Sequence, residues 1–265
     1  MKSFMKKLTK AFWLYIQPLT QRPEQVGDPV SDLFIWRRSK EWKTFFELTD
    51  IAGLFDDRDG ASSRSVTIVF FDNKGDQFLE KCLELLPNQR QTIDLSEFVS
   101  ESQSSFGTFC IFHSTPQVIS GLGSFITERG YVSYRYKNAP LRSYVHGNLD
   151  AVSLSRNKSL KLLCLSSFFL REYRLQHELL GPALYEVGIV NPSSRKKKFI
   201  CHVLSSKEGG MLSTQEIILR PRASHVFPIQ VEKLQSVRVV IKSYLVMARP
   251  LVYRTQKQHI DVFHG

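Results

Sequence analysis

Hydrophobic and polar positions alternate with a period of two along most of the chain after residue 40. The clearest segments are EWKTFFEL (41–48), SVTIVFF (65–71), FGTFCIFHS (106–114), YVSYRY (131–136), LYEVGIVN (184–191), KFICHVLSS (198–206), QEIILRP (215–221), VRVVIKSYLV (237–246) and PLVYR (250–254). Gly, Asn, Asp and Ser separate these segments, as expected for turns. The pattern predicts short antiparallel strands and an all-β fold. Residues 158–180 fit either a strand pair or a helix.

Two stretches of the chain follow the same order of strands and turns. Residues 62–95 and 193–229 both open with Ser-Ser-Arg, pass through a strand, a polar turn and a second strand, and reach a proline. The turn glycines, Gly75 and Gly209, precede the prolines, Pro87 and Pro221, by 12 residues in both stretches. Glycine suits a hairpin turn, and proline suits the end of a strand. This spacing predicts two tandem duplicated antiparallel β-sandwich modules at residues 32–150 and 151–265.

Residues 1–31 have a different character, with a basic apolar stretch, MKSFMKKLTKAFWLYIQ, followed by a proline-rich linker. The stretch predicts an amphipathic helix that binds an anionic membrane surface. The predicted membrane contacts are Lys2, Phe4, Lys6, Lys7, Lys10, Phe12 and Trp13. Two other interpretations remain: the helix packs on the protein itself or on a second copy, or it is a targeting presequence.

The composition bounds the partners. The 265 residues are 42% hydrophobic, which indicates a folded protein, and the net charge is +11, which favours surfaces that bear phosphate or carboxylate. Because no RNP, KH or helix-turn-helix pattern is present, nucleic acid is the least favoured of these partners. The four cysteines, Cys82, Cys110, Cys164 and Cys201, form no CxxC pair and are predicted to be buried free thiols in a reducing compartment. We therefore expect a cytoplasmic protein, peripheral at the inner face of the membrane.

A repeated phrase gives the candidate binding residues. YVSYRYKNAPLRSYVHG (131–147) and LVYRTQKQHIDVFHG (251–265) each contain a Tyr-Arg pair followed at a distance by His-Gly. The candidates are Tyr134, Arg135, His146, Tyr253, Arg254 and His264. If the modules pack about a pseudo-twofold axis, these side chains form a cleft for an anionic or sugar ligand, since Arg binds carboxylate or phosphate and Tyr stacks on sugars. The alternative is that repeated residues only hold each module together.

Other signals are weaker. The sequence has no nucleophile elbow, P-loop, dinucleotide fingerprint or HExxH pattern, and we expect no cofactor. The acidic run DDRDG (56–60) is read as a solvated turn and GLGSF (121–125) as a mobile loop. The basic run RKKK (195–198) suits nucleic acid, lipid or an acidic glycan equally well. The seven histidines are too scattered in sequence to predict a metal site.

At fold level each half resembles the small β-sandwich of the sensory-rhodopsin-transducer family. The resemblance lies in a hairpin with a polar turn, a strand that ends near a proline, and a Ser-containing strand that leads to an Arg, as in VRVVIKSYLVMARPLVYR (237–254). It implies a small oligomeric sandwich that binds partners or small ligands without obvious catalysis.

Three functions are consistent with these observations. The leading expectation is a non-catalytic or accessory protein that recognises a glycan or another anionic ligand, in the setting of bacterial surface-polysaccharide biosynthesis. The second is an enzyme acting on carbohydrates or nucleotide sugars, with His146 and His264 as acid–base groups. The third is a homo-oligomeric scaffold that binds other proteins.

Overall fold

The computed structural model of the chain describes residues 12, 18, 20–25, 27–51, 64–87, 89–100, 104–114, 126–246, 249–256 and 259–265, without the side chains of 148–150. The elements named over these residues are twenty β-strands and one short 3-10 helix, Leu95–Glu97, which confirms the all-β class. Residues 158–180, left open between strand and helix, contain strands β11, β12 and β13.

The strands fall into two groups along the chain. The first half contains β1 (Val30–Arg37), β2 (Trp42–Thr49), β3 (Arg64–Asp72), β4 (Gln77–Leu85), β5 (Arg90–Asp94), β6 (Phe106–His113), β7 (Thr127–Glu128), β8 (Tyr131–Tyr136), β9 (Ser143–Val145), β10 (Asn148–Leu154) and β11 (Leu160–Leu162). The second half contains β12 (Ser166–Arg174), β13 (Leu179–Leu180), β14 (Ala183–Val190), β15 (Lys197–Ser205), β16 (Met211–Leu219), β17 (Ser224–Val231), β18 (Ser236–Leu245), β19 (Leu251–Gln256) and β20 (His259–His264).

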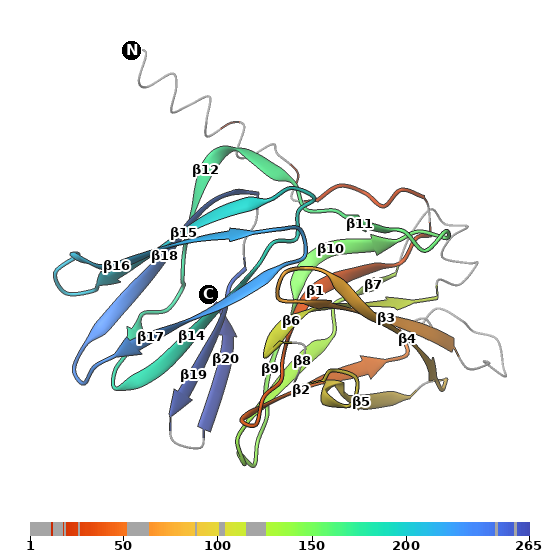
Figure 1. Cartoon of the computed structure of the whole chain (residues 1–265), viewed down its shortest axis with the longest axis horizontal. Helices are drawn as coiled ribbons and strands as arrows, with labels where there is room; N and C mark the ends of the chain where they lie inside the picture. Colours follow the sequence, from red (N-terminus) through yellow and green to blue (C-terminus); the bar gives the residue numbers. More distant parts are fainter. Residues whose placement is uncertain are drawn as a thin grey trace.

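Four sheets result, two in each half (Figure 1). Sheet 1 has the order β11-β10-β1-β6-β3-β4, and sheet 2 has the order β5-β2-β8-β9. Sheet 3 has the order β12-β18-β15-β16, and sheet 4 has the order β17-β14-β19-β20. The pairings along these orders are antiparallel, whereas the short strand β7 joins β1 in parallel. The hairpin β3–β4 beside β6 in sheet 1 thus corresponds to β15–β16 beside β18 in sheet 3.

Each half has its own hydrophobic core. Sheets 1 and 2 contribute the aromatic side chains Phe34, Phe46, Phe70 and Phe109, which are fully buried and pack against one another. Sheets 3 and 4 enclose a second core of mostly aliphatic residues around Phe199. The first core also includes side chains from the second half, namely Cys164, Val190, Leu251, Tyr253 and Val262. The two halves are therefore packed against each other through apolar contacts.

Strand β1 is the best-buried element, since all eight of its residues are buried. Its first residues pair with β10, and Phe34–Arg37 pair with β6, so the strand lies inside sheet 1. A strand covered on both faces lacks the apolar–polar alternation that marks the others. It begins at Val30, within the segment read as linker, and Thr20 forms a bridge to Cys164.

The hairpin turns are confirmed. Gly75 and Gly209 occupy the turns after β3 and β15, with φ angles of 87° and 66°, a region that glycine enters without strain. Pro87 and Pro221 both follow the second strand of their hairpin. The prediction that all four thiols are buried is wrong at Cys82, which is exposed because β4 is an edge strand with mostly exposed side chains.

The expected module boundary between residues 150 and 151 falls inside β10. Both β10 and β11 belong to sheet 1, and the first strand of sheet 3 begins at Ser166. Among the predicted membrane contacts, Phe12 is described and its side chain is 62% exposed. The other contacts, Lys2, Phe4, Lys6, Lys7, Lys10 and Trp13, lie outside the described residues, as do the runs 56–60 and 121–125.

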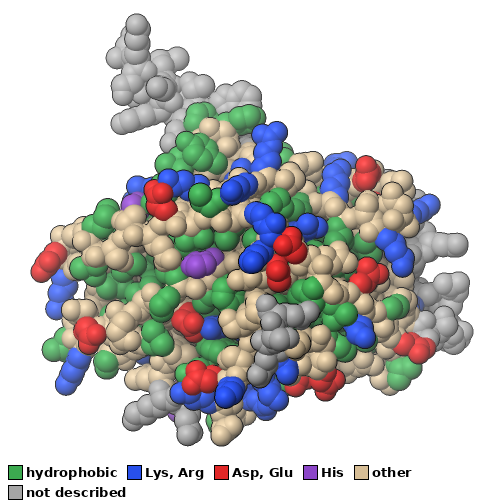
Figure 2. Space-filling model, in the orientation of Figure 1, with side chains coloured by type: hydrophobic (Ala, Val, Ile, Leu, Met, Phe, Trp, Pro, Cys, Tyr) green, Lys and Arg blue, Asp and Glu red, His purple; other side chains and the backbone are tan. Residues whose placement is uncertain are grey.

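The surface mixes basic, acidic and hydrophobic side chains on the face seen in Figure 2. In the part of the chain that the structure describes, no helix has the length and apolar character needed to cross a membrane.

Candidate functional site

The two predicted tyrosines are core residues. Tyr134 and Tyr253 are both fully buried, and their rings meet edge to face with centroids 5.1 Å apart. The Tyr134 hydroxyl donates a hydrogen bond of 2.6 Å to the carbonyl oxygen of Ile35. Burial raises the pKa of Tyr253 to about 12, so the ring stays neutral. These rings anchor the contact between the halves rather than a ligand.

The Tyr-Arg pairs differ in strand phase. Tyr134 points into the first core together with Val132, its neighbour two positions away. In β19, Val252 points into the second core, while Tyr253 points out of it towards the first half. Because successive strand residues face opposite sides, a shift of one residue reverses every side chain. Tyr134 therefore lies on the inner face of sheet 2, whereas Tyr253 lies on the outer face of sheet 4.

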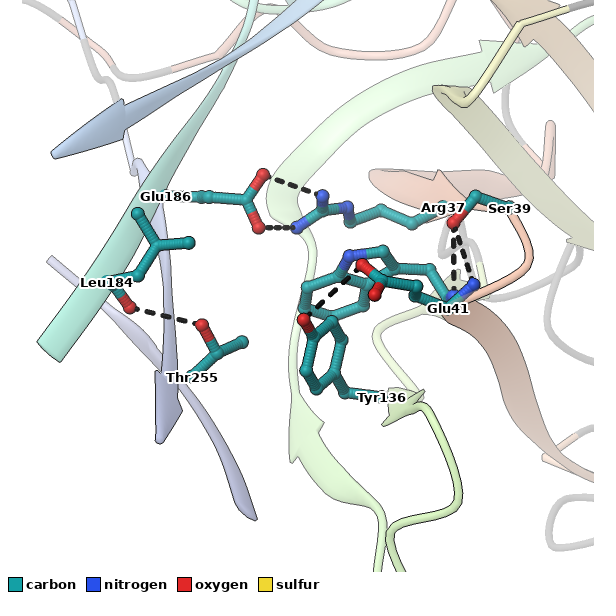
Figure 3. Close-up of polar contacts among 8 residues, drawn as sticks. Arg37, Ser39, Glu41, Tyr136, Leu184, Glu186 and Thr255 are labelled. Atoms are coloured by element: carbon teal, nitrogen blue, oxygen red, sulfur yellow. Dashed lines mark hydrogen bonds and ion pairs between the residues drawn. The ribbon is translucent and has the colours of Figure 1, made fainter. Parts of the chain in front are cut away.

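An ion pair between Arg37 and Glu186 joins the halves (Figure 3). Arg37, at the end of β1, donates two hydrogen bonds of 2.8 Å to the carboxylate of Glu186 on β14. Its guanidinium also lies 3.6 Å from the ring centroid of Trp42 and 4.7 Å from that of Tyr253. The side chains of Arg37 and Glu186 are only 8% and 20% exposed. This pair is a structural link between the halves.

The two predicted histidines, His146 and His264, lie near this contact between the halves. The Nδ1 atom of His146 is 3.0 Å from the carbonyl oxygen of Arg129, and its ring centroid is 4.3 Å from that of Tyr131. Burial, together with the charges of Arg249 and His146, lowers the pKa of His264 to about 4. His264 is therefore neutral at pH 7.

The two predicted arginines lie on separate surfaces. Arg135 lies over the ring of Phe45, 5.3 Å from its centroid, on the outer face of sheet 2. Arg254 lines a cavity of about 330 Å³ in the second half, together with His177, Asp261 and Phe263. The six predicted residues therefore do not line one cleft.

An open groove of about 640 Å³ lies on the first half, and we call it the sheet 2 groove. Its lining includes Glu47, Arg90, Glu128, Arg129, Tyr131 and Tyr144. Strand pairing places Glu47 beside Tyr131, and Tyr144 beside Ser133, all on the outer face of sheet 2. The side chains of Tyr131 and Tyr144 are 49% and 43% exposed. Two aromatic faces are thus available to a ligand next to a carboxylate.

The carboxylate of Glu47 forms part of the floor and is tightly held. It accepts a hydrogen bond of 2.8 Å from the Thr92 hydroxyl and lies 3.2 Å from Arg90 and 3.3 Å from Arg142. Glu47 is 5% exposed, whereas the Arg90 side chain is 63% exposed. A ligand in the groove therefore meets an arginine that is already oriented by a buried partner.

A second buried carboxylate, Glu128, borders the groove. Its Oε2 atom is 2.5 Å from Nε2 of His113, and its Oε1 atom accepts a hydrogen bond from the amide of Gly130. The side chains of Glu128 and His113 are each 1% exposed. These contacts fix the chain where it enters β8. Over the described residues, no cluster of three or more His, Cys, Asp or Glu side chains has metal-binding geometry.

Sequence reasoning missed Tyr131, Tyr144, Glu47 and Arg90. A signal was present, since the alternation in YVSYRY puts Tyr131, Ser133 and Arg135 on one face and Val132 and Tyr134 on the other. Deciding which face is buried requires the partner strands, and these come from distant segments.

Comparison with known proteins adds little. No protein-family model and no curated protein matches the chain. A solved calcium-binding mutant of Bacteroides uniformis beta-glucuronidase 2 is 12% identical, with a TM-score of 0.20, over 88% of this chain and 25% of that one. A structure of the catalytic domain of Clostridium perfringens ZmpB with two CBM51 domains is 9% identical, with a TM-score of 0.20, over 82% of this chain and 33% of that one. The chain thus spans only a quarter to a third of these proteins, and the similarity assigns neither fold nor function.

Proposed function

We propose that this chain is a non-catalytic, accessory glycan-binding protein made of two tandem duplicated β-sandwich modules. The duplication is supported by the matching strand orders of sheets 1 and 3 and of sheets 2 and 4. It is also supported by the paired hairpins with glycine at positive φ. We also propose that the protein acts at an anionic membrane surface through its basic N-terminal residues, in a setting such as bacterial surface-polysaccharide biosynthesis.

One observation carries the glycan assignment: the sheet 2 groove presents two exposed tyrosine rings beside a buried carboxylate. Aromatic faces stack on the apolar faces of sugar rings, while carboxylate and guanidinium groups bind hydroxyls. Tyr131 and Tyr144 supply the first kind of contact, and Arg90, which is held by the buried Glu47, supplies the second. Because Arg90 is largely exposed and Arg129 is adjacent, the groove favours a glycan that bears a carboxylate or phosphate.

An enzymatic function is the second candidate, because His146 contacts Tyr131 at the edge of the groove. A histidine in this position is within reach of a bound sugar and has an ordinary role as a general base. His264, the other proposed acid–base group, has a pKa lowered to about 4 and is a poor proton donor at neutral pH. We therefore favour binding without turnover.

The test is a thermal-shift screen of the full chain against neutral oligosaccharides, uronic-acid oligosaccharides and nucleotide sugars. We expect an acidic oligosaccharide to raise the melting temperature of the wild type. Tyr131→Ala and Tyr144→Ala should abolish most of that shift, and Tyr244→Ala, which removes an equally exposed tyrosine from the second half, should keep it.

Two results would contradict the proposal. A shift that survives both groove substitutions but disappears in Arg254→Ala would place the ligand in the cavity of the second half. No shift with any glycan, in a protein that melts cooperatively, would remove the binding function and favour a scaffold. Release of product from a glycan that binds would instead support the enzyme.

A further inference from the structure

The outer face of sheet 3 has an exposed apolar corner. Phe168 and Leu170 on β12, Tyr244 on β18 and Ile218 on β16 have exposed fractions of 76%, 40%, 50% and 59%. We call these four residues, with Lys196 and Lys198, the corner patch. Exposed large apolar side chains that gather on one surface mark an interaction site more often than isolated ones do.

Strand pairing places the members of the patch next to one another. Lys198 pairs with Ile218, and Phe199 pairs with Ser243, which puts Tyr244 on the other side of Lys198. On β12, Phe168 and Leu170 lie on the same exposed side as Glu172, which pairs with Lys242, two residues before Tyr244 on β18. Ile218, Lys198 and Tyr244 therefore form a row across β16, β15 and β18, with Phe168 and Leu170 on the same face of the sheet.

The charge of this corner is positive. Lys198 pairs with Glu216 at 2.7 Å, and Lys242 pairs with Glu172 at 3.7 Å, so these four charges cancel. Arg195 and Lys196, exposed in the loop before β15, add two positive charges. They belong to the RKKK run, whereas Lys197 points inward, is 7% exposed and donates to the Ser166 hydroxyl at 2.5 Å.

Thr20 and Gln21, which follow the basic N-terminal segment in the sequence, join the fold shortly before β12. Thr20 forms a bridge with Cys164, and the amide of Gln21 donates a hydrogen bond of 2.8 Å to the carbonyl of Leu163, directly before β12. Figure 1 shows β12 at the top of the second half, and Figure 2, in the same orientation, shows hydrophobic and basic side chains gathered there. The sequence before these contacts, residues 1–17, carries four lysines.

We propose that the corner patch is a docking surface for an anionic lipid bilayer. Apolar side chains that insert among headgroups, with lysines alongside, are the combination that binds such a surface, and a basic segment earlier in the chain adds to it. The proposal deepens the membrane part of the proposed function and uses no residue of the sheet 2 groove. A protein partner is the alternative, and it predicts no dependence on lipid charge.

The experiment is co-sedimentation of the full chain with vesicles of phosphatidylcholine alone and with vesicles containing 30 mol% phosphatidylserine, on the order of physiological anionic content. The wild type should sediment with the anionic vesicles only. Lys196→Glu with Lys198→Glu should weaken binding at least about fivefold, because Lys196 contributes about fivefold and the charge of Lys198 is already balanced by Glu216. Tyr244→Ser with Ile218→Ser should weaken it about tenfold.

The matched control is Lys207→Glu with Lys233→Glu, two exposed lysines of the second half outside the patch, which should bind within about twofold of wild type. Normal sedimentation of both patch variants, with the wild type bound, would overturn the patch and leave binding to the N-terminal residues alone. Failure of the wild type to sediment on either vesicle would overturn the membrane role as a whole. The glycan shift of the same variants is expected to be unchanged, so the two proposals fail separately.

Discussion

Sheets 2 and 4 have equivalent strand orders, but their outer faces have different neighbours. In sheet 4 the pairs Glu186–Tyr253 and Gly188–Leu251 point at the first half and are packed against it. In sheet 2 the pair Glu47–Tyr131 lines the open groove. One face is an internal interface and the other is accessible to a ligand.

Side-chain size and charge account for the difference. Gly188 leaves room for Ile35, because a Cβ atom there would lie 3.0 Å from its Cδ1, and Tyr253 fills the space beside Trp42 and Tyr134. In sheet 2, Arg135 and Arg142 cover Phe45, and their charged groups remain in contact with water. Sheets 2 and 4 thus differ in the packing of this face although their strand orders match.

The strongest test of the packed face is Arg37→Ala. It leaves Glu186 without its bidentate partner at a seam where both side chains are largely buried, and we expect unfolding in urea to show a loss of about 3–5 kcal/mol. Lys137→Ala is the matched control, because its ion pair with Glu41 is about half exposed on both sides and should change the stability far less. Equal losses in the two variants would mean that the seam pair does not hold the halves together.

A smaller effect is expected from Gly188→Val. Valine favours strands, but its side chain would collide with Ile35 and with the Tyr253 ring, 3.2 Å away, so we expect a loss of about 1–3 kcal/mol. Gly210→Val is the control, since no heavy atom lies within 4 Å of a Cβ atom at that position. Thermal unfolding measures both, and a neutral Gly188→Val would show that the seam is loosely packed.

The smallest expected effect concerns pH. Because the pKa of His264 falls from its usual 6.5 to about 4 in the folded chain, protonation of its ring favours unfolding. Its contribution to stability is present above pH 6.5 and is lost as the pH falls towards 4. Relative to His264→Gln, the wild type should lose about 1–2 kcal/mol between pH 7 and 4.5, a figure reduced for the partial exposure of the ring. Identical pH profiles in urea denaturation would contradict this environment for His264.

Much of the fold was predictable because alternation and turn residues are local signals. The strands at 41–48, 65–71 and 198–206 and the turns at Gly75 and Gly209 were all found this way. Strand β1 was missed because it is buried on both faces and has no alternation. The exposure of Cys82 was missed because the position of β4 at a sheet edge depends on pairings between distant segments.

The candidate site was less predictable. The repeated pairs Tyr134-Arg135 and Tyr253-Arg254 lie on β8 and β19. The two tyrosines face opposite sides of their sheets, because the strands differ by one position in phase. The type of a residue does not determine which side of its strand it faces. That side is determined by which residues of the strand contact the core. The proposed binding surface therefore contains Tyr131, which lines the groove, and not the buried Tyr134.

The contrast between the outer faces of sheets 2 and 4 is tested most directly by nitration of tyrosines with tetranitromethane. The nitrated positions are mapped by peptide mass spectrometry, with and without an acidic oligosaccharide. Without ligand, Tyr131, Tyr144 and Tyr244 should react, and the buried Tyr253 should not. With ligand, Tyr131 and Tyr144 should be protected while Tyr244 reacts as before. Rapid nitration of Tyr253, or a bound glycan that protects neither groove tyrosine, would contradict the account.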